Sequence, residues 1–286
     1  MKIIFFGTPD FVIPVAESLK DNFNLVAVVT TPDQPVGRKQ AITPPQIKNW
    51  AQQYNVPVLQ PQQFNNETIQ QLNTLLPDLF VVAAYGKIIP QQILDIPKLG
   101  AINIHPSKLP QFRGSSPIQA TILSGIKNSA ITIIKMDEQM DHGPVIKTIP
   151  FEINENETFQ SLAEKTFRLA AQILPSTIQS QFNLIDQDHA KATYTKIITK
   201  QDGFIDLDNP PTPEQFDRMV RAYYPWPGVW AKLKTENLKL KTIKFLPNNK
   251  VQLEGKNPVD METFFRGYPE LKEKFSYLLP SLSQHF

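Results

Sequence analysis

The chain has 286 residues, of which 41% are hydrophobic and 20% charged, a composition typical of a soluble globular protein long enough for two domains. Its formal net charge of +2 excludes a chain-wide attraction to polyanions, so any nucleic-acid surface has to be a local patch. The absence of cysteine excludes disulfides, thiolate catalysis and cysteine zinc sites.

The apolar runs of the sequence are short throughout. The start "MKIIFFGTPDF" reaches Gly7 after too few apolar residues for a signal peptide. No later run approaches the roughly 18 apolar residues that a membrane span needs. We therefore expect a protein of the cytoplasm, or of the equivalent organellar matrix, with no membrane partner.

Short apolar runs alternate with amphipathic stretches through the first two-thirds of the chain. The expected strands are 2–6, 24–30 and 78–86, and the expected helices are 10–20, 44–54 and 66–76. This alternation predicts an α/β fold with a doubly wound, mostly parallel sheet that is covered on both faces. Ligands bind outside the carboxyl ends of the strands in such sheets, which is where Gly7, Tyr85 and His105 fall.

The remaining sequence predicts further elements and a division into domains. Strands at 131–136 and 144–153 are expected to form an antiparallel pair, and a helix is expected over 158–182. Polar sequence without periodicity follows, and a helix near 213–222 then precedes several short strands. We expect three parts, which are an α/β domain (1–186), a linker (187–203) and a small β-barrel of OB-like type (204–286).

The C-terminal part carries a cluster of lysines. Between Ala231 and Lys250 the single acid is Glu236, and the six lysines are Lys232, Lys234, Lys239, Lys241, Lys244 and Lys250. Alternate residues of a strand share a face, so Lys232 and Lys234 lie on the same face of their strand. Lys239 and Lys241 likewise share a face of theirs. Such lysines either protect edge strands from pairing or contact phosphates, and the pattern leaves both explanations open.

The stretch "AINIHPSKLPQFRG" at 101–114 interrupts a buried strand pattern with polar side chains. Asn103 and His105 are two residues apart, so they point to one face of a strand with α-carbons roughly 6 to 7 Å apart. An imidazole donates or accepts a proton near neutral pH, and an amide N–H stabilises a carbonyl oxygen that becomes negative. Acyl transfer needs this combination, so the pair predicts a catalytic site.

An ionised group is also needed to orient the imidazole or to relay protons. Asp141 in the loop "MDHG" is the candidate, and Asp137 competes with it on spacing alone. Gly143 favours Asp141, because a glycine allows a close approach of the backbone. Structural explanations remain open, since strand-end histidines are often buried hydrogen-bonding groups and loop aspartates often cap turns.

Motifs across nearly the whole chain resemble those of one known family. They are "IIFFGTPDF", "TTPDQPVGR", "VVAAYGKIIP", "AINIHPSKLPQFRGSSPIQ", "MDEQMDHGPVI", "YTKIITKQDGFIDL" and "RAYYPWPGVW". On these motifs the sequence resembles the methionyl-tRNA formyltransferase family, and its Asn-x-His motif with a distal Asp marks the wider superfamily of formyltetrahydrofolate-using formyltransferases. The resemblance implies that Asn103, His105 and Asp141 are the catalytic set.

The resemblance also implies substrates and binding residues. The donor would be 10-formyltetrahydrofolate and the acceptor the amino group of methionine on initiator methionyl-tRNA, with no metal involved. Folate binding is assigned to "SKLP", in which lysine replaces the usual leucine, that is, to Ser107, Lys108, Leu109 and Pro110. Binding of tRNA is assigned to an abbreviated C-terminal barrel and to Arg38 and Lys39, in a loop (32–45) with fewer lysines than the family usually has.

Other functions remain open on the sequence. The same three residues would serve a sugar N-formyltransferase or a formyltetrahydrofolate hydrolase, neither of which needs the loop 32–45 or the lysine-bearing tail. A protein that binds nucleic acid without catalysis is a further alternative, and an intact Asn103, His105 and Asp141 argues against it. We expect a monomer.

Overall fold

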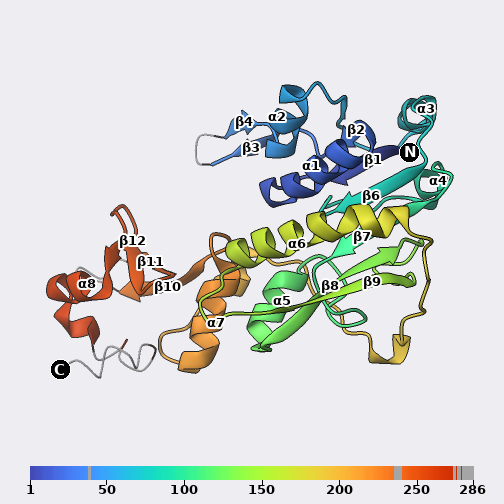
Figure 1. Ribbon diagram of the computed structural model, residues 1–286. Helices are drawn as coiled ribbons and strands as arrows, with labels where there is room; N and C mark the ends of the chain where they lie inside the picture. Colours follow the sequence, from blue (N-terminus) through green and yellow to red (C-terminus); the bar gives the residue numbers. More distant parts are fainter. Residues whose placement is uncertain (38–39, 235–239, 273–274, 276–277, 279–286) are drawn as a thin grey trace. The chain divides into compact units, whose positions relative to one another are not determined.

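The computed structural model describes residues 1–37, 40–234, 240–272, 275 and 278. The chain folds into two compact units, which can be followed by sequence colour in Figure 1. The first comprises Met1–Pro117, Asn128–Glu152 and Ala163–Thr195, and the second comprises Ile118–Lys127, Ile153–Leu162 and the chain from Lys196 onward. Two short segments from the middle of the sequence therefore belong to the second unit.

The first unit is built on a seven-stranded sheet. Its strands are β1 (Lys2–Gly7), β2 (Asn24–Val29), β5 (Val58–Leu59), β6 (Leu79–Ala83), β7 (Ala101–His105), β8 (Asn128–Lys135) and β9 (Val145–Glu152). Their order is β5-β2-β1-β6-β7-β8-β9, with parallel pairs from β5 to β7 and antiparallel pairs from β7 to β9. The predicted mostly parallel sheet and the later antiparallel pair are confirmed.

The helices of the described chain occur mostly between these strands in sequence. They are α1 (Ile13–Asn22), α2 (Gln46–Gln53), α3 (Asn66–Thr74), α4 (Gln91–Leu94), α5 (Pro117–Ser124), α6 (Phe159–Gln179), α7 (Pro213–Tyr223) and α8 (Met261–Gly267). Those expected from the sequence are confirmed as α1, α2, α3, α6 and α7. None of the described helices is long and apolar enough to cross a membrane.

The central strands are apolar on both sides because helices pack against both faces of the sheet. On one face, Phe6 and Phe80 form a buried cluster with Leu72 of α3 and Ile93 of α4. Residues between these positions alternate to the other face, as in Phe5, which is fully buried. The helices of the first unit also contact each other, since the Ser18 hydroxyl of α1 donates to a carbonyl of α6 at 2.6 Å.

The second unit contains a four-stranded antiparallel sheet. Its strands are β10 (Val229–Lys234), β11 (Leu240–Leu246), β12 (Lys250–Leu253) and β13 (Val259–Asp260), paired in that order. We expected a small β-barrel of OB-like type here; the antiparallel β character is confirmed, and within the described residues no pair joins β10 to β13 to close a barrel. Phe216 of α7 packs edge-on against Phe245 of β11 with ring centres 5.0 Å apart, so the helix covers the sheet's apolar face.

A short hairpin that the sequence analysis did not predict follows β2. It consists of β3 (Gln34–Val36) and β4 (Ala41–Thr43), which pair antiparallel. The expected tRNA-binding residues Arg38 and Lys39 stand between these strands in sequence and lie outside the described residues, as does Lys239 of the C-terminal lysine cluster.

Candidate active site

The candidate site lies where three neighbouring parallel strands end. β1, β6 and β7 are adjacent in the sheet, so the residues that follow them share one edge, as predicted. The Thr8 hydroxyl, after β1, donates to the Tyr85 carbonyl, after β6, at 2.9 Å. The strand order reverses between β1 and β6, because the chain builds β2 and β5 on one side and β6 and β7 on the other. Such a switch point is where open α/β sheets bind ligands.

The Tyr85 side chain lies in an aromatic cluster and is 2% exposed. Its ring centre lies 5.4 Å from that of Phe6 and 6.2 Å from that of Phe64. Burial raises the pKa of the Tyr85 hydroxyl to about 12, so the phenol stays protonated at neutral pH. Within the described part of the chain this hydroxyl has no hydrogen-bond partner. The Tyr85 hydroxyl is therefore a buried donor on a residue that follows β6, one of the strands that end at the ligand-binding edge.

Asn103, His105 and Asp141 come together at the end of β7. Asn103 Nδ2 donates to Asp141 Oδ1 at 3.1 Å, and Asp141 Oδ2 lies 3.4 Å from His105 Nδ1. The His105 and Asp141 side chains are 4% and 11% exposed, whereas Asn103 is partly exposed. An amide, an imidazole and a carboxylate therefore contact one another in a place largely closed to water, with the amide at its accessible end.

The imidazole of His105 is held through both ring nitrogens. Its Nε2 lies 2.9 Å from the Phe112 carbonyl oxygen, and because a carbonyl only accepts, Nε2 carries a proton. Nδ1 faces the Asp141 carboxylate, so a proton taken up at Nδ1 is shared with that carboxylate. The ring can therefore gain and release a proton at Nδ1 without turning.

The loop between β8 and β9 is shaped so that Asp141 reaches β7. Asp141 adopts a left-handed φ of 51°, and the backbone amide of Gly114 donates to its Oδ2 at 2.7 Å. The close approach predicted at Gly143 is confirmed, because a Cβ there would overlap the carbonyl oxygen of Lys135. A larger residue at position 143 would therefore push the loop away from the sheet.

Asp137, the competing carboxylate, is engaged elsewhere. Its Oδ2 lies 2.7 Å from His142 Nδ1, and its Oδ1 accepts from the backbone amide of Gln139 at 2.9 Å. The geometry therefore favours Asp141 over Asp137 as the partner of His105. The described residues contain no group of three or more His, Asp or Glu side chains that could hold a metal ion.

The stretch assigned to folate binding forms a tightly held loop after β7. The fully buried Ser107 donates through its hydroxyl to the Gln111 carbonyl at 2.6 Å. Thr132 of β8 donates to the Ser107 carbonyl at 2.7 Å and accepts from the Leu109 amide at 3.2 Å. Lys108 is exposed, and the next two residues are partly exposed. Ser107 therefore shapes the loop, and Lys108 is the side chain that the loop offers to solvent.

A buried polar network beside the site has no counterpart in the sequence analysis. Arg113 is 1% exposed, and its Nη2 lies 2.7 Å from Gln187 Oε1 and 2.9 Å from His189 Nδ1. Gln187 and His189 fall in the stretch expected to be a linker, and they belong to the first compact unit. Arg113 stands within the motif at 101–114, but its neighbours in sequence give no sign of these distant partners.

Lysines and a tryptophan share the outward face of the sheet in the second unit. Trp230 of β10 pairs with Lys244 of β11, and Lys232 follows Trp230 on the same face. Alternate residues such as Ile243 are fully buried, so this face points away from the core. The Nζ atoms of Lys232 and Lys200 lie 5.9 and 5.7 Å from the centre of the Trp230 ring. The face combines positive charge with an aromatic surface.

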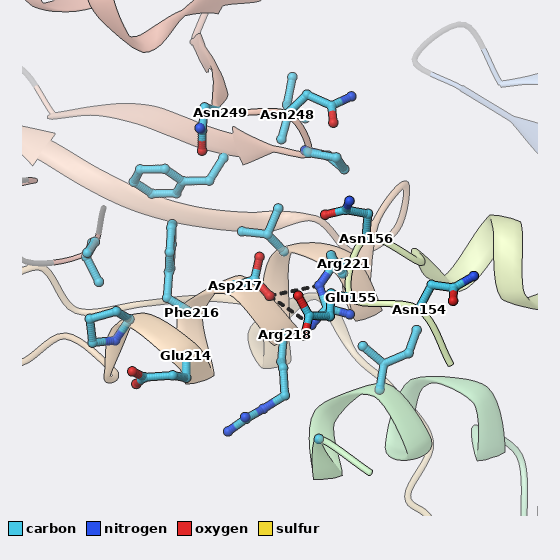
Figure 2. Close-up of a pocket in the computed structure, with 18 of the residues that line it drawn as sticks. Asn154, Glu155, Asn156, Glu214, Phe216, Asp217, Arg218, Arg221, Asn248 and Asn249 are labelled. Carbon is cyan, nitrogen blue, oxygen red and sulfur yellow. Dashed lines mark hydrogen bonds and ion pairs between the residues drawn. The ribbon is translucent and has the colours of Figure 1, made fainter. Parts of the chain in front are cut away.

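The second unit also contains a cavity of about 700 Å³, which none of the three catalytic candidates lines. Figure 2 shows its polar residues, which come from α7, from the loop after β9 and from the turn between β11 and β12. Arg221 pairs with Asp217 at 2.8 Å and donates to the Glu157 carbonyl at 3.1 Å. The cavity is therefore distinct from the Asn103, His105 and Asp141 cluster.

Comparisons of sequence identify relatives over most of the chain. Residues 1–178 match the family model described as formyl transferase, and residues 197–250 match the one described as formyl transferase, C-terminal domain. Methionyl-tRNA formyltransferase of Bacillus velezensis is 40% identical over 245 residues, which are 84% of this chain and 77% of the relative. That of Caldicellulosiruptor saccharolyticus is 41% identical over 246 residues, which are 84% of this chain and 78% of the relative.

Solved structures share the fold at lower identity. A methionyl-tRNA formyltransferase from Clostridium thermocellum aligns with a TM-score of 0.60 and 19% identity over 91% of this chain and 99% of that chain. WlaRD, described as a sugar 3N-formyl transferase in the presence of dTDP and 5-N-formyl-THF, aligns with a TM-score of 0.56 and 18% identity over 90% of this chain and 99% of that chain. The two family models and the relatives at 40% and 41% identity show that this chain belongs to the formyl transferase family.

Proposed function

We propose that this chain transfers the formyl group of 10-formyltetrahydrofolate to the amino group of methionine on initiator methionyl-tRNA, producing N-formylmethionyl-tRNA for translation initiation. The observation that carries the proposal is the contact of Asn103, His105 and Asp141 at the carboxyl end of β7. The relatives named methionyl-tRNA formyltransferase support the acceptor, and the fold neighbour described with 5-N-formyl-THF supports a folate donor. The proposal includes a cytoplasmic monomer that uses no metal.

Each of the three residues has a role in the proposed reaction. The neutral amine attacks the formyl carbon and forms the new C–N bond, and the bond from that carbon to N10 of the folate then breaks. Asn103 has two amide N–H groups, of which Asp141 accepts one, so the other can stabilise the formyl oxygen as it becomes negative. His105 and Asp141 take the proton that leaves the amine and return one to N10.

The proposed functions are assigned to three consecutive parts of the chain. Residues 1–186 catalyse the reaction, with the donor held by Ser107, Lys108, Leu109 and Pro110, and 204–286 bind tRNA. The stretch 187–203 connects them, and its residues up to Thr195 belong to the first compact unit. The two family models, at 1–178 and 197–250, support this order. Deleting the tail would remove most of a unit that also includes 118–127 and 153–162, so point substitutions are the better test.

Two basic regions are proposed to hold the tRNA. The face formed by Trp230, Lys232 and Lys244 offers ammonium groups for phosphates and an aromatic ring for an unpaired base. Arg38 and Lys39 are proposed to contact the acceptor end, because a guanidinium suits bidentate phosphate contact or stacking on a base. A sugar or a water molecule as acceptor needs neither region.

Replacing Lys232 and Lys244 by glutamine should weaken tRNA binding and reduce its salt dependence. Each phosphate contact contributes about 0.7 to 0.9 to the slope of log affinity against log salt, so the double variant should lose about 1.4 to 1.8 from the slope if both lysines make such a contact. Binding titrations of charged initiator tRNA at several salt concentrations measure this slope. Lys147→Gln, at an exposed position of β9, is the control. If the salt dependence of tRNA binding is unchanged in the double variant, Lys232 and Lys244 do not contact tRNA phosphates, and this part of the proposal is wrong.

A competition assay tests the proposed function directly. The protein is incubated with 10-formyltetrahydrofolate and offered charged initiator tRNA, charged elongator tRNA, an amino sugar nucleotide and water. We expect formylation of initiator methionyl-tRNA to be the fastest reaction. Faster formylation of the amino sugar would replace the proposed acceptor with a sugar, and release of formate without transfer would identify a hydrolase.

A further inference from the structure

The stretch 187–195 packs along the loop that follows β7. The amide of Arg113 donates to the Thr193 carbonyl at 2.8 Å, and the amide of Thr195 donates to the Arg113 carbonyl at 2.7 Å. Phe112, whose carbonyl accepts from the proposed catalytic imidazole, donates its own amide to the Thr193 hydroxyl at 2.8 Å. The stretch therefore supports the backbone that holds one side of the site.

Gln187, at the start of this stretch, connects the two loops of the site. Its Nε2 lies 2.9 Å from the Asp141 carbonyl oxygen, 3.1 Å from that of His142 and 2.7 Å from that of Gly143. Its Oε1 accepts from Arg113 Nη2 at 2.7 Å. The opposite orientation of the amide would direct its oxygen at three carbonyl oxygens, so these partners fix which end faces which loop.

Arg113 holds the other end of the Gln187 amide in place. A guanidinium only donates, so His189 Nδ1, which lies 2.9 Å from Nη2, accepts, and the proton of the neutral ring is on Nε2. The His189 ring stacks on that of His142 with ring centres 4.0 Å apart and an interplanar angle of 2°. Nη1 of Arg113 donates to the Tyr194 hydroxyl at 3.4 Å. The oxygen of Gln187 is therefore fixed by a group that is itself held on several sides.

We propose that Gln187 is a positioning residue for formyl transfer, which acts by fixing the carbonyls of 141–143 so that the Asp141 carboxylate faces Asn103 and His105. The inference rests on the proposed function. The left-handed φ of Asp141 is unfavourable for most side chains, so the loop needs fixed partners to keep it. Gln187 is 7% exposed and shares the two N–H donors of its amide among three successive carbonyls, so the loop has a fixed partner there.

Gln187→Glu tests the proposal with little change of shape. One carboxylate oxygen still accepts from Arg113, while the other replaces the amide nitrogen and repels the three carbonyls. A misplacement of about 1 Å can cost about 10²-fold in rate, so we expect kcat to fall about 10-fold or more with little change in KM for the formyl donor. The matched control is Gln181→Glu, the same change at an exposed position outside the stretch 187–195, which should keep the wild-type kcat.

A double-mutant cycle distinguishes positioning from a merely structural role. Gln187→Glu is introduced into wild type and into the Asp141→Asn variant, and kcat is measured in all four proteins. If Gln187 acts through Asp141, its substitution should cost less than about 2-fold once the carboxylate is gone, since residues that act as a unit do not add. Equal fold losses in the two backgrounds would overturn the proposal.

A second substitution and the choice of acceptor keep the test decisive. If Gln187→Glu does not fold, Gln187→Asn enters the same cycle, because it keeps the amide and withdraws it from the carbonyls by one methylene. If wild type formylates only an amino sugar, the proposed acceptor is wrong and the cycle, run with that sugar, still decides the role of Gln187. If wild type transfers no formyl group, the proposed function and this inference both fall.

Discussion

His105→Ala should lower the turnover number of formyl transfer by at least about a hundredfold, because loss of a general acid or base typically costs about 10²–10⁴ in rate. The imidazole is the side chain in this cluster whose nitrogen can take up and release a proton, and its Nδ1 faces the Asp141 carboxylate at 3.4 Å. Alanine leaves Asp141 and Asn103 without that proton carrier. The measurement is kcat at saturating folate and charged tRNA.

The fold should survive this substitution, because the strand pairs of β7 are made by the backbone. Thermal unfolding and folate titration check that the variant is folded and binds the donor. Thr148→Ala, at an exposed position of β9, is the control. It should retain most of the wild-type turnover. Near-normal turnover in a folded His105→Ala protein would exclude the imidazole from the chemistry.

The parts of this protein that follow from its sequence are those with a local physical signature. The continuous apolar run at 78–86 predicts a strand buried on both sides, and β6 is such a strand. Asn103 and His105 lie two residues apart on β7, and the period of two alone predicts that their side chains share a face. The location of the site at the carboxyl edge follows from the predicted parallel sheet, because ligands of such sheets bind outside the carboxyl ends of the strands.

The parts of the structure that cannot be predicted from the sequence depend on contacts between residues far apart in the chain. Gln187 Oε1 accepts from Arg113, which lies 74 positions away in the sequence. The spacing of apolar and polar residues in either segment gives no indication of that contact. The polar stretch 187–195 lacks hydrophobic alternation because residues 193–195 hydrogen-bond to the loop after β7 and the regular part of the stretch is one short 3-10 turn, His189–Lys191. The hairpin of β3 and β4 was missed for another reason, since each strand is only three residues long and β3 contains a proline.

Asp141→Asn should lower turnover by at least about a hundredfold as well, although it preserves the size and shape of the side chain. The carboxylate accepts at both oxygens, from Asn103 Nδ2 at one and from the Gly114 amide at the other, where it also faces His105. An amide replaces one of these acceptors with a donor. In one orientation the new N–H faces the Gly114 amide, and in the other it faces Asn103, whose amide then has to turn its oxygen inward and loses its place as a donor.

Asparagine is the informative replacement because the backbone conformation should not change. Asp141 has a φ of 51°, which asparagine adopts more readily than alanine, so the loss can be assigned to the carboxylate rather than to the loop. Asp95→Asn is the control, since Asp95 is exposed after α4 and its carboxylate accepts from the Gln91 side chain, and it should keep most of the turnover.

The combination of the two substitutions gives the sharpest result. His105 and Asp141 are proposed to move one proton together, so the His105→Ala, Asp141→Asn double variant should lose much less than the product of the two single losses. The measurement is kcat in single-turnover reactions for the wild type, both single variants and the double variant, each checked for folding by thermal unfolding. Losses that multiply would mean that the two residues act independently, and the shared proton route through Nδ1 would then be wrong.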